Sequence, residues 1–189
     1  MTVKLAKILG VRQASKMPSK SLELMRTRNL KLNPNLARQL LLHGSDMPVM
    51  VRIKNYFFNR VFRGKDKKAL EFLIKHSSEK NNPNELSRSY VIVGLSELAF
   101  EGKVKETLPG LLIGANDSNS SIRRSSLMGL QGLAELGMKE TLPGLLKGIN
   151  CEDTITRTIA MNGIKALAES GDAKAKEELQ RIYPYRMGL

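Results

Sequence analysis

Four cations and a tyrosine are predicted to lie along one helix, where they could contact phosphate groups. The cations are Arg52, Lys54, Arg60 and Arg63, and the tyrosine is Tyr56. At 3.6 residues per turn, Tyr56, Arg60 and Arg63 share one side of that helix. Arg52 lies on the side of Tyr56, one turn earlier. A row of guanidinium and ammonium groups is the chemistry that neutralises nucleic-acid phosphates. The alternative is a solvated helix face whose charges neutralise no partner.

The excess of positive charge is confined to the first third of the 189-residue chain. Residues 1–68 contain 16 Lys and Arg against three acids, which gives +13, the formal net charge of the whole chain. Residues 69–189 contain 15 of each and are neutral overall. This asymmetry indicates nucleic acid, an acidic membrane surface or an acidic protein as the partner. The residues that we expect to contact an anionic partner are Lys4, Lys7, Arg12, Lys16, Lys20, Arg26, Arg28, Lys31, Arg52, Lys54, Tyr56, Arg60, Arg63, Lys65, Lys67 and Lys68.

The chain lacks the residue patterns that catalysis or metal binding requires. Its two histidines, His43 and His76, are expected at the surface near helix C-termini, where a cation is favoured. The single Cys151 excludes an intramolecular disulfide and a cysteine-based zinc cluster, and it is expected in a loop as a tolerated small residue. No HExxH, CxxC, serine-nucleophile elbow or phosphate-binding glycine loop occurs. The sequence therefore predicts no enzyme, no metal site and no cofactor.

An internal repeat of 34 residues determines how these side chains must be positioned. Residues 104–137 recur as residues 138–171, and both copies contain the string Lys-Glu-Thr-Leu-Pro-Gly-Leu-Leu. Two weaker copies precede them, aligned at offsets of 35 and 38 residues. Self-similarity at this period indicates a stack of similar units, because no single unit buries its own apolar face.

Each unit has the apolar spacing of two helices. Expected helices outside the two strong copies are residues 36–42, residues 66–76 and a last, unpaired helix at residues 172–182. Glycines mark recurring positions. Gly94, Gly129 and Gly163 fall in mid-helix, where glycine costs about 1 kcal/mol, so we expect neighbouring helices to approach closely there. Four more glycines stand where helices should end as C-caps: Gly64, Gly102, Gly137 and Gly171.

The period and the helix opening Ile122-Arg123-Arg124-Ser125-Ser126-Leu127 resemble a HEAT repeat, in the short form found in phycobilisome lyase subunits and in bacterial and archaeal scaffold proteins. The resemblance is carried by residues 104–182, is weaker over 34–103 and covers none of residues 1–30. It implies an all-α, right-handed α-solenoid of about four helix pairs plus a C-terminal capping helix. It further implies a concave face that binds macromolecules, and no catalysis. Arg123 and Arg157, which share one repeat position, would pair with acids of the neighbouring unit as a structural ladder.

We divide the chain into a basic N-terminal extension, residues 1–33, and a HEAT-like repeat domain, residues 34–189. The repeats are expected at approximately 34–64, 65–102, 103–137 and 138–171, with a cap at 172–189. The extension buries too little to fold firmly alone, so we expect it to order against the solenoid or a partner. Its first 20 residues are basic but hold one Arg and little Ser. This composition favours the cytoplasm over the mitochondrial matrix.

The sequence supports two binding hypotheses. In the first, a non-enzymatic HEAT-like module docks its basic N-terminal third on an anionic assembly, either an RNA particle such as a ribosome or DNA, and contacts another protein through the concave face. In the second, the chain is a protein–protein adaptor or scaffold that recognises an acidic protein. Neither requires a membrane span or a small-molecule substrate. An enzymatic alternative rests only on the kinship of such repeats with bilin lyases and DNA glycosylases. The absence of Trp and of an isolated acid opposes it.

Overall fold

The computed structural model describes residues 32–43, 47–102 and 104–182, and in these residues the chain is helical without any strand. The all-α class is thereby confirmed. The α-helices are α3 (Pro34–His43), α4 (Met47–Phe62), α5 (Lys67–Lys75), α6 (Glu85–Phe100), α7 (Leu108–Gly114), α8 (Ser120–Glu135), α9 (Leu142–Ile149), α10 (Thr154–Glu169) and α11 (Ala173–Ile182). Two 3-10 turns, η2 (Lys105–Thr107) and η3 (Lys139–Thr141), precede α7 and α9.

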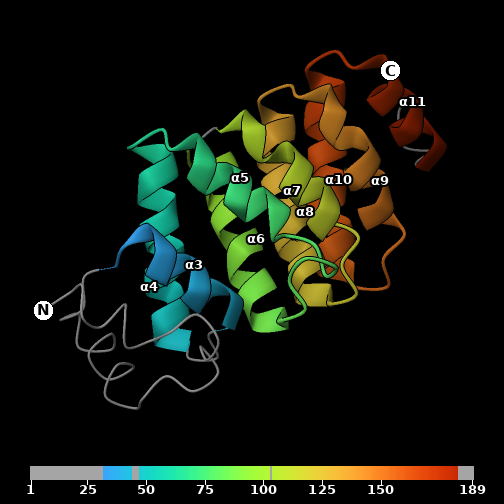
Figure 1. The fold of residues 1–189 in the computed structure, drawn as a ribbon. Coiled ribbons are helices and arrows are strands. Elements are labelled where there is room, and N and C mark those ends of the chain that lie inside the picture. Colours follow the sequence, from blue (N-terminus) through green and yellow to red (C-terminus); the bar gives the residue numbers. More distant parts are fainter. Residues whose placement is uncertain (1–31, 44–46, 103, 183–189) are drawn as a thin grey trace, which may run out of the picture.

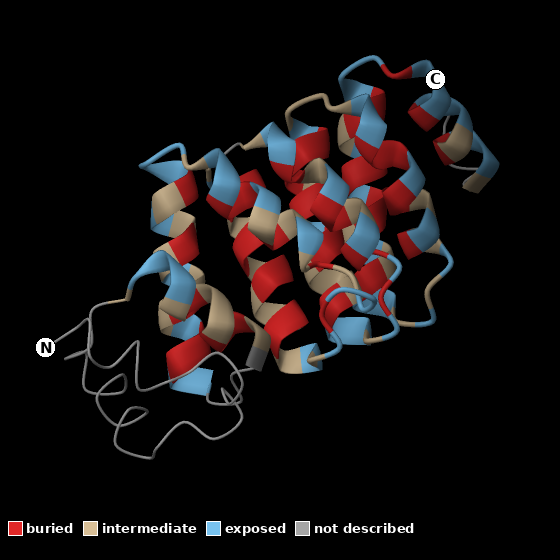
Figure 2. Ribbon diagram, in the orientation of Figure 1, coloured by how far each residue is buried: buried red, intermediate tan, exposed pale blue. Residues whose placement is uncertain are grey.

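The helices form two layers (Figure 1). Helices α4, α6, α8 and α10 pack on one another in chain order, and we call them the second-helix layer. Helices α3, α5, α7 and α9 cover one side of that layer, and α11 packs on α10 at the end of the stack. Buried residues lie mainly between the two layers (Figure 2). The core is almost entirely aliphatic, as the low aromatic content requires, and Phe57 is its one buried phenylalanine among the described residues.

The four helices of the second-helix layer have the same length, 16 residues each. Every position in one of them therefore has a counterpart in the other three. The tenth position is glycine in α6, α8 and α10. A Cβ atom at Gly129 would lie 3.0 Å from Ser96 Cα in α6, and one at Gly163 would lie 3.3 Å from Gln131 Cα in α8. The predicted close approach of neighbouring helices is confirmed at these two glycines.

Helix ends are satisfied by short polar side chains and by backbone geometry. Asp66, Asn84, Asn119 and Asp153 are N-caps whose side chains accept hydrogen bonds from the first turn of the following helix. At the other end of α8, Gly137 has a φ of 76° and its N–H donates to Ala134 O, while the next N–H donates to Leu133 O. These are the bonds of a Schellman cap, and Gly171, with a φ of 94°, repeats them after α10.

Gly64 and Gly102 do not act as left-handed caps, which corrects the sequence expectation. After α4, the N–H groups of Arg63 and Gly64 both donate to Asn59 O, so the chain continues its helical path and reverses one residue later. Lys65 takes the positive φ, 49°. Gly64 is needed for space instead, because a Cβ atom there would lie 2.7 Å from Arg60 O, and Gly102 meets Leu98 O at 2.8 Å in the same way.

Arg88, Arg123 and Arg157 occupy the fourth position of their helices and perform one shared task. Each Nη1 donates to the two carbonyl oxygens that lie five and six residues earlier, in the loop before the helix, at 2.5–3.1 Å. Arg123 and Arg157 thus bind loops of their own units, and the expectation that they pair with acids of the neighbouring unit is wrong. They close the turn that leads into each helix.

The ion pairs between units involve other residues. Arg88 Nε lies 2.8 Å from Asp117 Oδ2 of the next unit, and both side chains are only 2% exposed. The residue 34 positions after Asp117 is Cys151, so Arg123 finds no carboxylate at the corresponding place. Arg124 supplies the next contact instead, with its Nη2 atom 2.8 Å from the N-cap carboxylate of Asp153. The ion pairs between successive units are therefore Arg88–Asp117 and Arg124–Asp153.

We expect Gly129→Ala to lower the free energy of unfolding by about 1–3 kcal/mol, because the methyl group has no space between Leu111 and Ser96. Gly94→Ala is the matched control at the same helix position. Its Cβ atom meets only Lys54 Cγ, at 3.3 Å, so the higher helix propensity of alanine should stabilise the protein by up to about 1 kcal/mol. Urea unfolding measures both values. Equal stability of the two variants would contradict the close approach.

We expect Arg88→Gln to cost about 3–5 kcal/mol, because it leaves Asp117 buried without its cation. Arg124→Gln should cost at most about 1 kcal/mol, since that side chain is 38% exposed and its pair is screened by water. Thermal and urea unfolding of both variants give the comparison. Similar losses would show that burial does not distinguish the two pairs.

Candidate anionic-partner interface

Half of the predicted partner-contacting residues lie outside the part of the chain that the structure describes. They are Lys4, Lys7, Arg12, Lys16, Lys20, Arg26, Arg28 and Lys31. The other eight lie on α4, in the α4–α5 turn and at the start of α5. Within that second group, the structure separates cations that bind the protein itself from cations that face water.

Lys54 belongs to the protein's own packing. Its side chain is only 13% exposed, and its ammonium group forms an ion pair with Glu97 of α6. Its aliphatic part faces Gly94, where the lack of a side chain leaves room for it. Lys54 thus joins α4 to α6, and its predicted place at an open phosphate-contacting edge is wrong.

Arg60 and Tyr56 share a side of α4, as predicted, and Arg60 binds both Tyr56 and a nearby acid. Arg60 Nε lies 2.6 Å from Asp66 Oδ2, Nη1 lies 3.2 Å from the Tyr56 hydroxyl, and the guanidinium stands 5.7 Å from the Tyr56 ring centroid. The hydrogen bond with Asp66 raises the pKa of Arg60. The pKa of Asp66 is lowered, first by the backbone N–H of Ala69 and then by Arg60.

These side chains line a shallow surface hollow formed by Tyr56, Asn59, Arg60, Gly64 and Asp66. The carboxylate of Asp66 sits in it as N-cap of α5 and as partner of Arg60. An anion entering the hollow would compete with that carboxylate. The hollow therefore orders the α4–α5 turn and offers no ready anion site.

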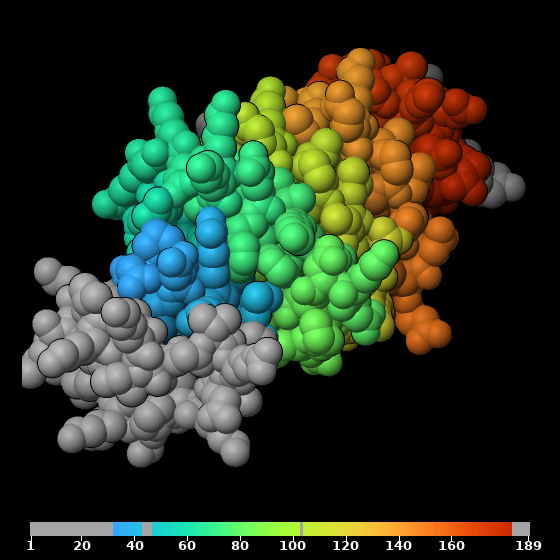
Figure 3. Space-filling view, viewed as in Figure 1, coloured from blue at the N-terminus to red at the C-terminus, as the bar shows by residue number. Residues whose placement is uncertain are grey.

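The cations that face water are Arg63, Lys65, Lys67 and Lys68. All four are exposed, and none forms an ion pair with a described residue. Because Asp66, the acid among them, is already bound to Arg60, their charge is not neutralised locally. Figure 3 shows the segment around the α4–α5 turn projecting from the surface at the upper left. We call these four residues the basic turn. Arg52 is half-buried on the preceding part of α4.

Lys65 has a conformation that lysine rarely adopts. Its φ of 49° lies in the left-handed region, which costs a residue with a Cβ atom about 1–2 kcal/mol. The two other residues with positive φ in the described chain are Gly137 and Gly171, both glycines. A lysine at such a position places its ammonium group at the tip of the turn at some cost in stability.

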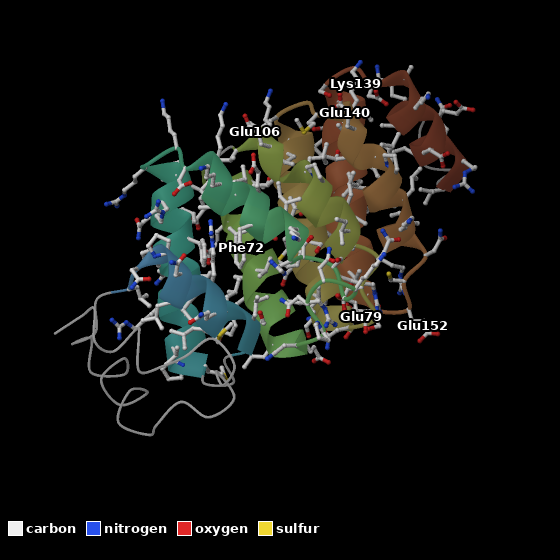
Figure 4. The ribbon with its side chains drawn as sticks, in the orientation of Figure 1. Phe72, Glu79, Glu106, Lys139, Glu140 and Glu152 are labelled. Atoms are coloured by element: carbon white, nitrogen blue, oxygen red, sulfur yellow. The ribbon has the colours of Figure 1, made fainter. Side chains whose placement is uncertain are left out.

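The rest of the same edge carries both signs of charge. Figure 4 shows Glu106, Lys139 and Glu140 along it, on the side towards the C-terminal units. Glu79 and Glu152 lie on the opposite edge, with the loops that precede α6 and α10. Residues 69–189 are neutral overall, so the net positive charge of the described chain lies before residue 69.

The histidine and cysteine environments offer no chemistry beyond packing. His76 is the C-cap of α5, stacks on Phe72 at 4.4 Å and is half-buried. Burial is the main cause that lowers the pKa of His76, which corrects the expectation of a favoured cation there. The His43 side chain lies outside the described part. Cys151 is partly exposed in its loop, with Sγ 3.7 Å from Lys147 O. Over the described ranges no group of His, Cys, Asp and Glu could hold a metal ion.

None of the described helices is long and apolar enough to cross a membrane. No protein-family model matches the chain, and no curated protein sequence matches it at a significant level.

We expect Lys65→Gly to raise the free energy of unfolding by about 0.5–1 kcal/mol, because glycine avoids the left-handed penalty but loses more backbone entropy on folding. Lys67→Gly is the control, since Lys67 is the first residue of α5 and glycine there should be neutral or destabilising. Urea unfolding decides between these values. A decrease in the stability of Lys65→Gly would contradict the strained turn.

Proposed function

We propose that this protein is a non-enzymatic HEAT-like repeat module, a right-handed α-solenoid, whose basic N-terminal third docks on an anionic macromolecular assembly. The observation that carries the proposal is the confinement of the whole +13 net charge to residues 1–68. The preferred assemblies are an RNA particle such as a ribosome, or DNA. The neutral C-terminal units cap the stack or contact protein.

The basic turn supports this proposal in the described chain. Its four cations are exposed and form no ion pair with a described residue, so phosphates could displace their counterions without breaking an existing pair. Contacts of this kind fix position and add affinity but read no base sequence. Docking on the shape and charge of a large particle therefore fits the turn better than recognition of a defined sequence.

A second candidate is an adaptor that recognises an acidic protein. It is favoured by the engagement of Lys54 and Arg60 with Glu97 and Asp66, which leaves a small basic footprint on α4. A few carboxylates would complement such a footprint. The two candidates differ in competition, since polynucleotide should displace a nucleic acid efficiently and an acidic protein poorly.

The test is binding of the full-length protein to a structured RNA and to duplex DNA between low and physiological salt. We expect the logarithm of the binding constant to fall linearly with the logarithm of salt concentration, by about 0.9 per phosphate bound in duplex DNA. Replacing the basic turn by glutamines (Arg63→Gln, Lys65→Gln, Lys67→Gln, Lys68→Gln) should reduce that slope by about one for each phosphate that the variant no longer binds. Replacing Lys4, Lys7, Arg12, Lys16, Lys20, Arg26, Arg28 and Lys31 should reduce it further.

A matched control removes the same charge elsewhere. Lys105, Lys165, Lys174 and Lys176 are exposed in the C-terminal units, and none forms an ion pair with a described residue. Changing all four to glutamine should leave the salt slope nearly unchanged. An equal effect of both quadruple variants, or binding that is weak and insensitive to salt throughout, would overturn nucleic-acid docking and leave the adaptor.

A further inference from the structure

The equal length of the four second helices allows their outer faces to be compared position by position. Positions 5, 9, 12 and 16 are spaced by four, three and four residues and so follow one side of each helix. In α10 all four are exposed and polar. The number of apolar residues at these positions rises from none in α10 to one in α8, two in α6 and three in α4. The apolar residues are Val51, Phe58, Phe62, Val93, Phe100 and Met128.

We call these six residues the apolar face. Val51, Phe62, Phe100 and Met128 are exposed, whereas Val93 and Phe58 are partly buried and Phe58 packs against the core. Phe62, Phe100 and Met128 are 44%, 52% and 52% exposed. The rings of Phe58 and Phe62 lie 5.4 Å apart. An apolar row of this kind across adjacent helices is typical of an interaction site.

The repeat indicates that an aromatic ring is not required at this place in every unit. Position 16, the last residue of each helix, is Phe62 in α4 and Phe100 in α6, but Glu135 in α8 and Glu169 in α10. All four are exposed. The same place in the fold thus accepts a charged side chain in two units. Both rings also contact the neighbouring unit, since a Cβ atom on Gly102 would lie 2.9 Å from Phe62 Cδ2 and one on Gly132 would lie 2.5 Å from Phe100 Cδ2. One edge of each ring thus lies on a glycine, while about half of each side chain remains exposed to water.

The charges at the rim change sign across the apolar face. Arg63 and Lys65 lie one and three residues after Phe62, whereas Glu101 directly follows Phe100 and Glu135 ends α8. A polynucleotide stacked on both rings would place phosphates beside Glu101. A peptide with acids at one end only meets the cations beside Phe62 and brings no like charge to Glu101 or Glu135. Protein is therefore the better occupant.

We propose that the apolar face binds an amphipathic helix of a partner protein. Its Leu, Met or Phe side chains cover Phe62 and Phe100, and its acidic end lies over the basic turn. Such helices are held by apolar anchors at i, i+3 or i+4, and i+7. The binding goes beyond nucleic-acid docking, because it uses a different surface and a different kind of contact.

The probe is a display library of random peptides of about 16 residues, a length that spans one helix of this layer, selected on the full-length protein. We expect enriched sequences with apolar residues at helical spacing and with Asp or Glu gathered at one end. Phe62→Gln/Phe100→Gln should weaken binding of the enriched peptides by about tenfold or more, as for aromatic residues at the centre of an interface. Ile113→Gln is the matched control, since Ile113 is 39% exposed on α7 in the other layer.

The protein variant Arg63→Glu/Lys65→Glu should bind the same peptides more weakly. It should bind peptides whose acidic end is changed to Lys without that loss. The neutral double phenylalanine variant should leave RNA binding through the basic turn unchanged, so the two proposals fail separately. The proposal is overturned if no peptides are enriched, if they lack an apolar stripe, or if they bind the double phenylalanine variant equally well. It is also overturned if that variant no longer binds RNA, which would indicate stacked bases. Conversion of a wild-type dimer to a monomer by the same variant would overturn it too, because the occupant would be a second copy of the chain.

Discussion

The stack depends on how closely successive second helices approach one another, and glycine at their tenth position makes that approach possible. At Gly129 the α8 backbone meets Ser96 Cα of α6 and two methyl groups of Leu111 from the covering layer. Gly163 repeats the arrangement one unit later with Gln131 and Leu145. A missing side chain therefore serves two contacts at once, one between neighbouring units and one between the layers. The cost of glycine in mid-helix is offset by the leucine packing that it permits.

A similar double use occurs at the loops that lead into the second helices. Each loop presents carbonyl oxygens that no helix satisfies, and an arginine at the fourth helical position donates to two of them in three successive units. Where the neighbouring unit also supplies a buried carboxylate, as Asp117 does for Arg88, the loop bond is extended into a bond between units. One arginine thus satisfies backbone carbonyls of its own loop and also forms the ion pair between two units.

Much of this could be predicted from the sequence because it is local or periodic. Helix type, N-caps, the Schellman glycines Gly137 and Gly171, and the close approach at Gly129 depend on short-range spacing. What could not be predicted depends on the residue that lies across an interface. A helical projection gives the side of the helix on which Lys54 and Arg60 each lie. It does not show that Glu97 of α6 forms an ion pair with Lys54, or that Asp66 forms one with Arg60.

The misassigned positions share that cause. Lys54 was expected at an open edge that contacts phosphates, but Glu97 of α6 lies opposite and forms an ion pair with it. Gly64 was expected to reverse the chain, but the N–H groups that bind Asn59 O carry the helical path one residue further. In both cases the sequence pattern identified a residue with a special role but did not show which groups surround it in the fold.

Positions 5, 9 and 16 of the second helices are exposed or only partly buried in all four units, so they are where a partner would be recognised. Across four units they change from apolar in α4 to polar in α10, while the buried positions keep their apolar character throughout. Net charge follows the same direction, from the excess cations of the first 68 residues to neutrality. Two independent properties therefore vary along the stack in the same sense, although the backbone repeats. Exposed phenylalanines, a left-handed lysine and a cluster of water-facing cations lie in the same two units, and a surface that binds a partner there would account for all three.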